Sequence, residues 1–488
     1  MPPKPFPHLL SPTQEEDLIT NAQQWALTNG LVMYPPNFDI HQASVAPITL
    51  FPTPIPKSSF ERAIKVQTLY NELYINLITK RKGWLVDILK SLAEFDPDFS
   101  GKLFDIYQKS IADGVLQPLS LGIFRSDYMI DSTEQQIKQI EFNTVSVSFG
   151  GLSTKIGQLQ SFLNLAGFYD DKYNFKYYED GEIPVSTSAT DIAQGLADGN
   201  YYYNGEADNK DTIVLFVVQP KERNCFDQRI VEYALFHDHG IRSVRVTLEE
   251  VDALVTNNSG KLYIKSTMDE ISVVYYRSGY GPSDYDSNPT KTWNARLFLE
   301  KSQAIKCPSI LTQLSGSKKI QQLLTNESII KQILPHVTDQ DLKSLLSTFV
   351  RILPFDESEQ GQEAAKLAIQ EPEKFVLKPQ REGGGNNIYK LDIPKFLDKI
   401  SKKDWGAYIL MELINPETYR NKILRNGEIY HENIVSELGV FGTIVFDEQT
   451  GSIKTNKNAG WLLRSKFETS DEGGVAAGFG CVDNAYIY

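Results

Sequence analysis

Residues 375–389 read FVLKPQREGGGNNIY, and the rest of the chain can be interpreted outward from this stretch. The apolar residues 375–377 predict a strand that ends at Lys378. Three consecutive glycines, 383–385, predict a loop whose bare backbone can approach an anion closely and turn its N–H groups toward it. Lys378 adds a positive charge, and Glu382 offers an oxygen ligand for Mg²⁺. These features favour a strand that leads into a phosphate-binding loop.

The glycine loop matches neither of two common phosphate-binding motifs. The chain contains no G-x-x-x-x-G-K-[ST], and no G-x-G-x-x-G stands between a predicted strand and a predicted helix. Three glycines alone would favour a solvent-exposed hinge. Because a lysine, an arginine and a glutamate fall within residues 378–382, phosphate binding is the better interpretation.

The composition is that of an acidic globular protein. The 488 residues are 41% hydrophobic and 23% charged, and their number suggests about three domain-sized units. The net charge is −13, whereas nucleic-acid binding rests on a basic surface, so we expect no nucleic-acid partner. An acidic protein that binds anions must gather its few cations in one cleft, so lysines and arginines inside motifs carry extra weight.

Three cysteines, Cys225, Cys307 and Cys481, lie far apart and never form C-x-x-C. Their odd number and their spacing argue against a disulfide framework or a zinc site and favour a reducing compartment. The N-terminus lacks the apolar core of a signal peptide. No apolar run approaches the ~18 residues of a membrane span. We therefore expect a cytoplasmic protein with no membrane partner.

The N-terminal region predicts helices and one informative strand. A capped helix begins at Ser11, with Pro12 at its first position and Gln14 completing a capping box. Residues 121–129 predict a strand that runs into a turn, with Arg125 where the apolar run stops. Strand ends often carry sites, but a surface arginine paired with Asp127 is slightly favoured on this segment alone. Other expected elements are a proline-rich connector at 51–57 and helices at 58–91 and 100–113.

Residues 137–152 read IKQIEFNTVSVSFGGL and are more informative. Strand alternation places Glu141 and Asn143 on one face, where a carboxylate and an amide oxygen suit Mg²⁺. Ser146 and Ser148 would face the opposite way on a straight strand, so the chain must turn before Ser146 for all four to share a site. An edge strand with its polar face in water is an equally good interpretation.

Residues 209–316 predict an α/β lobe with strands near 212–219, 242–247, 261–265 and 271–277 and a helix near 226–237. Another helix is expected near 186–197. Two polar groups follow strands of this lobe, where an arginine suits bidentate carboxylate recognition. For each of these two groups, a surface loop with charged side chains and no binding role is a comparably plausible interpretation. The first group is Glu222, Arg223, Asn224 and Gln228, and the second is Arg277, Ser278, Gly279 and Tyr280.

The C-terminal part predicts further phosphate chemistry. Lys318 starts a predicted helix after a possible N-cap at Ser317. A positive charge at a helix N-terminus is unfavourable, which suggests a bound anion there, although exposed lysines are also common at such positions. Residues 411–414 could line an adenine slot or simply belong to the core. Arg464 and Lys466 share a strand face, and a loop of small residues follows at 473–480. Residues 326–374 are expected to be mainly helical, 407–413 a strand, and 436–438 an acidic strand end.

Together these motifs resemble the eukaryotic type of glutathione synthetase, a homodimeric branch of the ATP-grasp enzymes. The resemblance covers the chain from the proline-rich connector to the C-terminus. Its strongest parts are 140–152, 222–228, 312–322, 375–389 and 462–478. It implies an α/β (α+β) ATP-grasp architecture with a mobile lid and an inserted α/β substrate-binding domain. The implied body is 1–208 and 317–488, the lid about 340–435, and the substrate-binding domain 209–316.

The resemblance also implies the reaction and its residues. ATP would phosphorylate the cysteinyl carboxylate of γ-glutamylcysteine, and the amine of glycine would attack the acyl phosphate to give glutathione. Two Mg²⁺ ions per subunit would be held by Glu141, Asn143 and Glu382. Charge in catalysis would be stabilised by Arg464, Lys318 and Lys378.

The binding residues that the resemblance implies form two sets. ATP, as cosubstrate, would contact Met129, Glu141, Lys318, Lys378, Pro379, Gln380, Arg381, Glu382, Gly383, Gly384, Gly385, Asn386, Asn387, Tyr389, Met411, Glu412, Leu413, Ile414, Glu437, Lys466 and Glu472. Some relatives carry aspartate at the position of Glu472, so a carboxylate is retained. The peptide and glycine would contact Arg125, Ser146, Ser148, Glu222, Arg223, Asn224, Gln228, Arg277, Ser278, Gly279, Tyr280, Arg464, Val475 and Ala476.

Two alternatives stay open. A related carboxylate–amine ligase could use another acceptor, such as β-alanine or serine, and the short loop Val475–Ala476 would decide this. A nucleotide-binding protein without catalysis is the second alternative. The presence of Glu141, Asn143, Glu382 and Arg464 argues against it.

Overall fold

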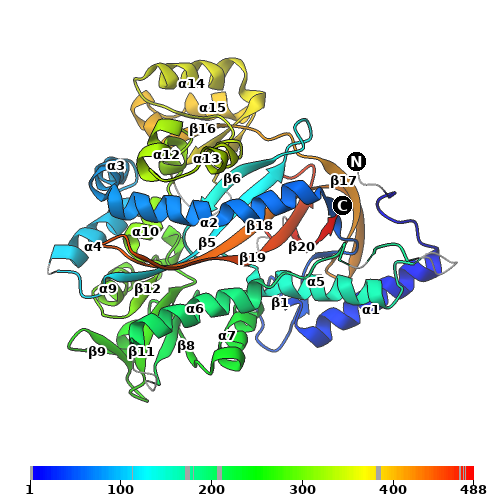
Figure 1. Ribbon diagram of the computed structural model, residues 1–488, viewed down its shortest axis with the longest axis horizontal. Helices are drawn as coiled ribbons and strands as arrows, with labels where there is room; N and C mark the ends of the chain where they lie inside the picture. Colours follow the sequence, from blue (N-terminus) through cyan, green and yellow to red (C-terminus); the bar gives the residue numbers. More distant parts are fainter. Residues whose placement is uncertain are drawn as a thin grey trace.

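The computed structural model describes residues 4–112, 114–170, 176–179, 181–205, 211–380, 386–471, 474–475, 478 and 480–488. Within these residues, thirteen strands form one large mixed sheet and four more form a second sheet. Figure 1 shows the large sheet in the centre of the molecule, with helices on both of its faces and the second sheet in the upper lobe. The expected α/β class is confirmed.

The large sheet is built from segments far apart in the sequence. Along it the strands follow the order β17, β3, β20, β19, β18, β5, β12, β11, β10, β9, while β6 also pairs with β5 and β7 pairs with both β11 and β8. Their bounds are β3 (Ile48–Thr49), β5 (Leu119–Ile130), β6 (Ile137–Asn143), β7 (Ile213–Val217), β8 (Ser243–Val246), β9 (Val255–Asn258), β10 (Lys261–Ile264), β11 (Glu270–Tyr276), β12 (Ile305–Cys307), β17 (Thr418–Arg425), β18 (Glu428–Asp447), β19 (Ile453–Phe467) and β20 (Gly480–Asp483).

Helices and two small strand pairs complete the body. Strand β1 (Val32–Met33) pairs with β2 (Ser44–Val45), and β4 (Thr53–Ile55) pairs with β21 (Ala485–Ile487). The helices are α1 (Pro12–Asn29), α2 (Lys57–Lys80), α3 (Lys82–Phe95), α4 (Ser100–Ala112), α5 (Gly150–Leu165), α6 (Ser188–Asn204), α7 (Cys225–His239), α8 (Val251–Leu254), α9 (Pro289–Glu300), α10 (Ile310–Ser315), α11 (Lys318–Leu323), α12 (Glu327–Ile333), α13 (Asp339–Leu346), α14 (Glu359–Gln370) and α15 (Asp392–Leu397).

Two apolar cores lie on opposite faces of the large sheet. In β18, Val440 and Ile444 belong to the core that contains α2, whereas Phe441 and Val445 belong to the core that contains α5 and α6. This alternation follows from the two-residue period of a strand. Both faces of the sheet centre are therefore covered, which explains its nearly continuous apolar runs.

The second sheet, which we call the lid sheet, holds β14 (Phe375–Pro379) with β13 (Ile352–Pro354), β16 (Tyr408–Glu412) and β15 (Ile388–Tyr389). Phe375 and Leu377 pack against α14 and α15 on one face. Val376 and Met411 form a smaller cluster on the other. Because β14 alternates in this way, Lys378 lies on the same face as Val376.

Several predicted elements are confirmed, and some need correction. The helix that starts at Ser11 has its capping box and ends at Gly30 in the left-handed conformation. The single helix expected at 58–91 is two helices, because the backbone leaves helical angles at Arg81, where φ is −119°. The connector 51–57 contains β4, which pairs in parallel with the C-terminal β21.

Polar residues were wrongly taken as strand ends at two positions. Arg125 lies in the middle of β5, and the acidic segment 436–438 lies in the middle of the 20-residue β18. In both strands the polar side chains alternate with apolar ones that face a core, so the strand continues through them. The helical region 326–374 likewise contains the short β13.

The lobe at 209–316 shares its sheet with the body. Strand β12 pairs in parallel with β5 through Lys306 and Ser120, and β11 and β7 continue the sheet from there. The division into a body, a lid and an inserted domain stays a prediction.

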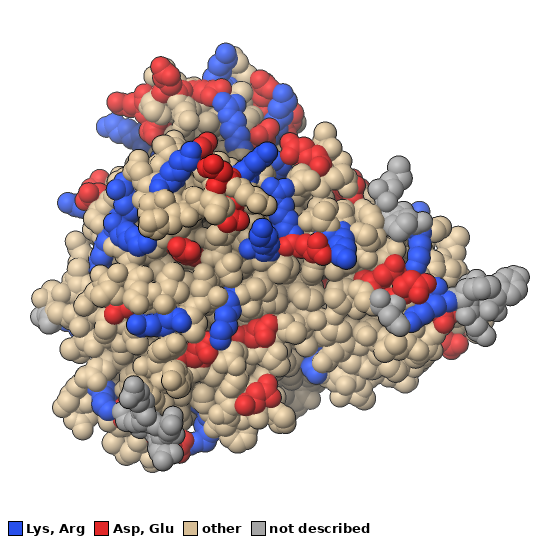
Figure 2. Space-filling model, viewed as in Figure 1, with Lys and Arg blue, Asp and Glu red and all other residues tan. Residues whose placement is uncertain are grey.

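The face seen in Figure 2 carries charges of both signs. Lysines and arginines are interspersed with aspartates and glutamates, most densely over the upper lobe, where Figure 1 places α12 to α15. Among the described helices, none combines the length and the apolar character that crossing a bilayer requires. The three cysteines are free thiols.

A buried carboxyl on β20 joins this strand to β3, β4 and β19. The carboxylate of Asp483 accepts hydrogen bonds from the hydroxyls of Thr49 (2.5 Å), Thr53 (2.6 Å) and Ser465 (2.6 Å). Burial raises the pKa of Asp483 to about 6, although these hydroxyls oppose the shift. The folded protein therefore holds the proton of Asp483 more tightly than the unfolded chain does.

Stability is expected to depend on pH through Asp483. Between its ordinary pKa of 3.8 and about 6, the folded state binds more protons than the unfolded state, so the free energy of unfolding falls as pH rises. The shift corresponds to on the order of 3 kcal/mol. Urea unfolding of wild type and Asp483→Asn at pH 4 and pH 7 tests this. The wild type should lose more stability over this interval than the variant, and equal losses would contradict the expectation.

Candidate functional site

A cavity of about 620 Å³ lies between the large sheet and the lid sheet. This volume is within the range of small-molecule binding sites. Strands β5, β6, β18 and β19 supply residues from the large sheet, and β14 to β16 supply residues from the lid sheet. Predicted site residues in its lining are Arg125, Met129, Glu141, Asn143, Ser146, Ser148, Tyr280, Lys378, Asn387, Tyr389, Met411, Glu412, Leu413, Ile414, Glu437, Arg464, Lys466 and Val475.

Two lysines lie near the carboxylate of Glu141, which lines the cavity. Lys318, at the start of α11, donates to Oε2 of Glu141 over 2.8 Å and lies behind it. Lys378 donates to the carbonyl oxygen of Ile140 over 3.0 Å. The anion that the position of Lys318 suggested is thus a carboxylate of the protein itself. Ser317 stands at the N-cap position, but its hydroxyl makes no cap hydrogen bond.

The ionisation of this cluster is set by burial and by the neighbouring charges. Burial alone would raise the pKa of Glu141, but Lys318, Lys378 and Arg464 hold it well below its usual range. Burial and the charge of Lys318 lower the pKa of Lys378 to about 8, although Glu141 opposes them. An anionic ligand beside Lys378 would stabilise its charged form. The cluster is therefore suited to a phosphate group.

A second set of charges continues along the same sheet face. The guanidinium of Arg464 donates from Nε to Glu437 over 2.8 Å and from Nη2 to Asp127 over 3.3 Å. Arg125 donates to the same Asp127 through Nε (2.6 Å) and Nη2 (2.7 Å). Burial would lower the pKa of Arg464, but Glu437 and Asp127 raise it. Carboxylates therefore orient both arginines.

The polar turn after β6 is confirmed. The strand ends at Asn143, and Ser146 adopts a positive φ of 52°, so Ser146 and Ser148 reach the same cavity as Glu141. Arg277 supports the turn by donating to the hydroxyl of Ser148 and to the carbonyl oxygen of Val147.

Asp227 fixes the other side of this turn. Its carboxylate accepts from the backbone N–H groups of Phe149, Gly151 and Leu152 over 2.8 to 2.9 Å, at the start of α5. Burial raises the pKa of Asp227, and the three N–H donors oppose the shift. Asp227 was not predicted as a site residue, and a carboxylate one turn after Asn224 on α7 was its only signal.

Oxygen donors at this place suit a divalent cation. Asn143 donates from Nδ2 to Asp127 over 2.9 Å, which leaves its carbonyl oxygen available beside the carboxylate of Glu141. A carboxylate and an amide oxygen are donors that Mg²⁺ accepts. The third predicted ligand, Glu382, lies outside the described residues. The residues that are described therefore fit a Mg²⁺ site without defining its geometry.

One end of the cavity is apolar. Met129, Ile140, Val376 and Met411 line it, with the segment 412–414 beside them. Met411 is also part of the small core cluster of the lid sheet, so its expected place in the core is confirmed, and the adenine slot stays a prediction. An apolar site of this kind suits a flat apolar ring with polar edges. The backbone groups of residues 412–414 could form hydrogen bonds with those edges.

Some predicted residues do not line the cavity. Gln228 accepts a hydrogen bond from Arg245 of β8, whereas Arg223 donates to the carbonyl oxygen of Tyr34, just after β1. Direct ligand contact by these side chains stays a prediction. The predicted residues outside the lining are Lys318, Pro379, Gln380, Asn386, Glu222, Arg223, Asn224, Gln228, Arg277, Ser278 and Gly279.

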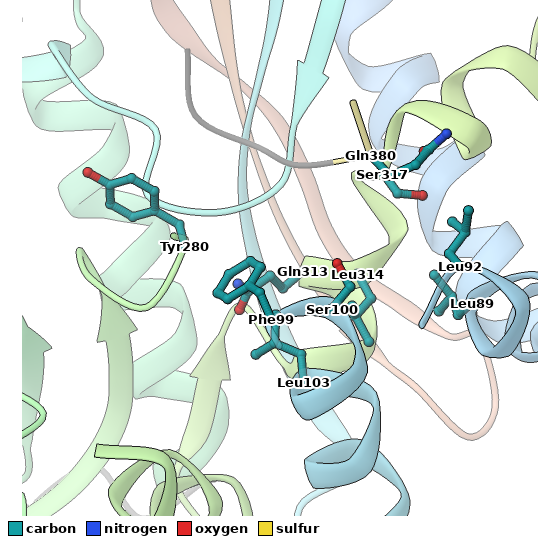
Figure 3. A pocket seen from close by; sticks show the side chains of 10 residues that line it. All are labelled: Leu89, Leu92, Phe99, Ser100, Leu103, Tyr280, Gln313, Leu314, Ser317 and Gln380. Atoms are coloured by element: carbon teal, nitrogen blue, oxygen red, sulfur yellow. The ribbon is translucent and has the colours of Figure 1, made fainter. Parts of the chain in front are cut away.

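Gln380 faces a different, smaller cavity. Its Oε1 accepts from the backbone N–H of Lys319 over 2.7 Å. Figure 3 shows Gln380 next to Ser317, on the opposite side of the small cavity from Tyr280. This cavity has a volume of about 30 Å³, enough for a water molecule. Gln380 therefore ties the end of β14 to α11, which carries Lys318, and does not point into the large cavity.

Several predictions fall on residues that the structure does not describe. The glycines 383–385 of one proposed lid and half of the residues of the other, 473–480, are among them, and the roles of both lids stay predictions. The predicted site residues outside the described ranges are Arg381, Glu382, Gly383, Gly384, Gly385, Glu472 and Ala476.

The comparisons with known proteins agree with this geometry. Residues 12–487 match the family described as eukaryotic glutathione synthase, ATP binding domain. The chain is 39% identical to the glutathione synthetase large chain of Schizosaccharomyces pombe, over 96% of this chain and 97% of that protein. It is 36% identical to the glutathione synthetase of Homo sapiens, with 97% of both covered. It is also 36% identical to the chloroplastic glutathione synthetase of Arabidopsis thaliana, with 97% and 85% covered.

A solved structure shares the fold. The glutathione synthetase-like effector of Globodera pallida in its apo form superposes with a TM-score of 0.75, at 20% identity and with 98% of both chains covered. The matched sequence family spans nearly the whole chain, and its relatives are covered over nearly their full length. The chain belongs to the eukaryotic glutathione synthase family.

Proposed function

We propose that this protein joins the cysteinyl carboxylate of γ-glutamylcysteine to the amine of glycine and converts ATP to ADP and phosphate. The observation that carries the proposal is the single cavity between the two sheets. It brings the Glu141–Lys318 pair and Lys378 together with Arg125, Asn143 and Arg464. The names of the relatives state the product, and this cavity has the charges that its synthesis requires.

The reaction balances without a nucleophilic side chain. An oxygen of the substrate carboxylate attacks the γ-phosphorus of ATP, and ADP leaves with the electrons of the broken P–O bond. The amine of glycine then attacks the acyl carbon, loses a proton and expels phosphate. Phosphoryl transfer of this kind depends on positioning and on charge stabilisation. Lys378 and Arg464 supply positive charge where the carboxylate and phosphate meet.

Mg²⁺ would be held by Glu141 and Asn143, with Glu382 as a further ligand and two ions per subunit. When bound, it supplies charge neutralisation on the phosphate oxygens. Lys318 orients Glu141 for this role, and Asp127 orients Asn143 through its amide nitrogen. Mg²⁺ donors and phosphate-binding lysines thus share one side of the cavity.

Location and assembly belong to the same proposal. The resemblance implies a homodimer, which sedimentation or light scattering would test. The three free thiols suit a reducing compartment, and we propose the cytoplasm. Some relatives are chloroplastic, so localisation of a tagged full-length chain is the direct test.

ADP release is expected to require both γ-glutamylcysteine and glycine. Purified protein with Mg-ATP should release ADP and form glutathione in equal amounts, and omission of either substrate should stop both. A panel of glycine, β-alanine and serine identifies the acceptor. ADP release that does not depend on the dipeptide would contradict the synthetase proposal. A faster reaction with β-alanine or serine would favour the related ligase, and no turnover with any acceptor would favour a non-catalytic protein.

A further inference from the structure

One buried carboxylate contacts three of the side chains on which the proposed reaction depends. Asp127 is only 1% exposed. It accepts two hydrogen bonds from Arg125, one from Asn143 over 2.9 Å and one from Arg464 over 3.3 Å. The proposed function gives Asp127 no contact with ATP, the metal or the peptide. We propose that Asp127 is a positioning residue that holds Arg125 in the orientation that binds the dipeptide; this proposal rests on the proposed function.

The register of the sheet brings these groups together. In the ladder between β5 and β6, Arg125 lies opposite Asn143, and Asp127 lies opposite Glu141. On the other side of β5, Asp127 lies opposite Gly439 of β18. Glu437, two residues before this glycine, lies opposite Arg464 of β19. Three adjacent strands, β5, β18 and β19, therefore present one row of alternating charge, Arg125–Asp127–Arg464–Glu437.

Gly439 leaves the space that this row occupies. A Cβ at position 439 would lie 2.9 Å from Cδ of Arg125 and 2.9 Å from Oδ1 of Asp127, closer than such atoms approach each other. A side chain there would push against both members of the pair. The absence of a side chain opposite Asp127 is therefore a requirement of the arrangement.

The two carboxylate oxygens of Asp127 have different partners. Oδ1 accepts from Nε of Arg125, whereas Oδ2 accepts from Nη2 of Arg125, from Asn143 and from Arg464. An amide in place of the carboxylate keeps its oxygen where three donors converge and turns its N–H₂ toward Nε of Arg125. Two donors then face each other, so Arg125 loses its bidentate hold while Asn143 and Arg464 keep their acceptor.

Arg125 is the side chain through which the effect should appear. It reaches the polar turn by donating from Nη1 to the carbonyl oxygen of Ser148 over 3.1 Å. When the bidentate hold is lost, the guanidinium can rotate away from this turn, where the dipeptide is proposed to bind. The Michaelis constant for γ-glutamylcysteine should therefore change more than the Michaelis constant for ATP.

The test is a kinetic comparison of Asp127→Asn with wild type and Asp483→Asn. Asp483 is an equally buried carboxyl on β20 that does not line the cavity. Asp127→Asn should raise KM for γ-glutamylcysteine by about 10- to 100-fold, as expected for a lost charge-assisted hydrogen bond. KM for ATP and kcat should stay within about threefold, and Asp483→Asn should leave all three within the same factor. Unchanged KM for the dipeptide in folded Asp127→Asn, or parallel changes in both KM values, would overturn the proposal.

Gly439→Ala tests the same arrangement without removing the carboxylate. It should raise KM for γ-glutamylcysteine in the same direction, and it decides the question if Asp127→Asn does not fold. Gly195→Ala is its control. A Cβ at position 195 would lie only 2.5 Å from the side chain of Thr443, and neither residue lines the cavity. A wild-type KM in Gly439→Ala would then overturn the proposal.

A crystal structure separates this proposal from the proposed function. Asp127→Asn should show the guanidinium of Arg125 rotated away from Ser148, whichever reaction the protein catalyses. An Arg125 in its wild-type position would overturn the positioning role. Inactivity of the wild type with γ-glutamylcysteine and glycine would instead overturn the proposed function.

Discussion

Replacing Arg464 with alanine is expected to lower kcat/KM for γ-glutamylcysteine by about 30- to 1,000-fold, which corresponds to roughly 2–4 kcal/mol of transition-state stabilisation. The guanidinium lines the cavity and is held on its far side by Glu437 and Asp127. Its remaining donors can face a carboxylate that becomes an acyl phosphate. Because that charge develops during the reaction, kcat should fall as well as kcat/KM.

Two further variants show whether this effect is specific. Lys457→Ala removes another cation from the same strand β19, whose ion pair with Asp198 lies outside the cavity and is partly exposed. Its activity should stay within about twofold of wild type, as expected for a surface pair. Arg464→Lys keeps the charge but loses the planar fork, so it should recover only part of the activity. Near-normal activity of Arg464→Ala would contradict the assigned role.

Replacing Lys318 with alanine is expected to lower kcat/KM for ATP by about 100-fold or more, or roughly 3 kcal/mol. The ammonium group is almost fully buried and donates to Glu141 over 2.8 Å. Without this ammonium group, less positive charge stabilises the ionised carboxylate of Glu141. The pKa of Glu141 should therefore rise toward its usual range. The protein should also become less stable, since one partner of a largely buried pair is lost.

A double-mutant cycle with Glu141→Gln tests whether the two side chains act together. The double variant should lose much less than the sum of the two single effects, because both single changes break the same pair. Lys319→Ala is the matched control: the neighbouring lysine of α11 pairs with Asp356 over 3.6 Å and does not line the cavity. Additive losses in the cycle, or an equal loss in Lys319→Ala, would refute the expected coupling.

The strand that carries Glu141 and Asn143 could be predicted because its signals are local. Two-residue alternation placed both side chains on one face, and the need for Ser146 to join them required a turn. The structure contains this turn, with a positive φ at Ser146. The helix capped by Ser11 and the strand that carries Lys378 were predictable for the same reason, since each depends on neighbours in the sequence.

The role of Asp127 could not be predicted in full. A strand places Arg125 and Asp127 on the same face, and that pairing was available from the sequence. Whether the pair lies in water or inside a site depends on β6 and β18, which cover it. The sequence alone favoured the surface pair. Burial of the pair depends in part on β18, which lies hundreds of positions later in the chain, and local patterns carry no information about such a contact.

The residues between Glu222 and Gln228 show a second limit. Polar residues after a strand predict a site, but they do not distinguish contact with a ligand from support of a loop. Here Asn224 donates to Asp227 over 3.3 Å, and Asp227 in turn holds the turn that contains Ser148. Arg277 supports the same turn directly. Only the positions of the side chains in the structure distinguish residues that support a loop from residues that can contact a ligand.

The pairing of β5 with β18 has a consequence for synthesis of the protein on the ribosome. Strand β5 ends at Ile130, and its partner β18 begins at Glu428, about 300 residues later. At roughly 5–20 residues per second, the edge of β5 stays uncovered for on the order of 15–60 s. During this interval Arg125 and Asp127 interrupt an otherwise apolar edge, and charges on an uncovered edge discourage pairing with other chains. We therefore expect these two charges to discourage association of the nascent strand with other chains.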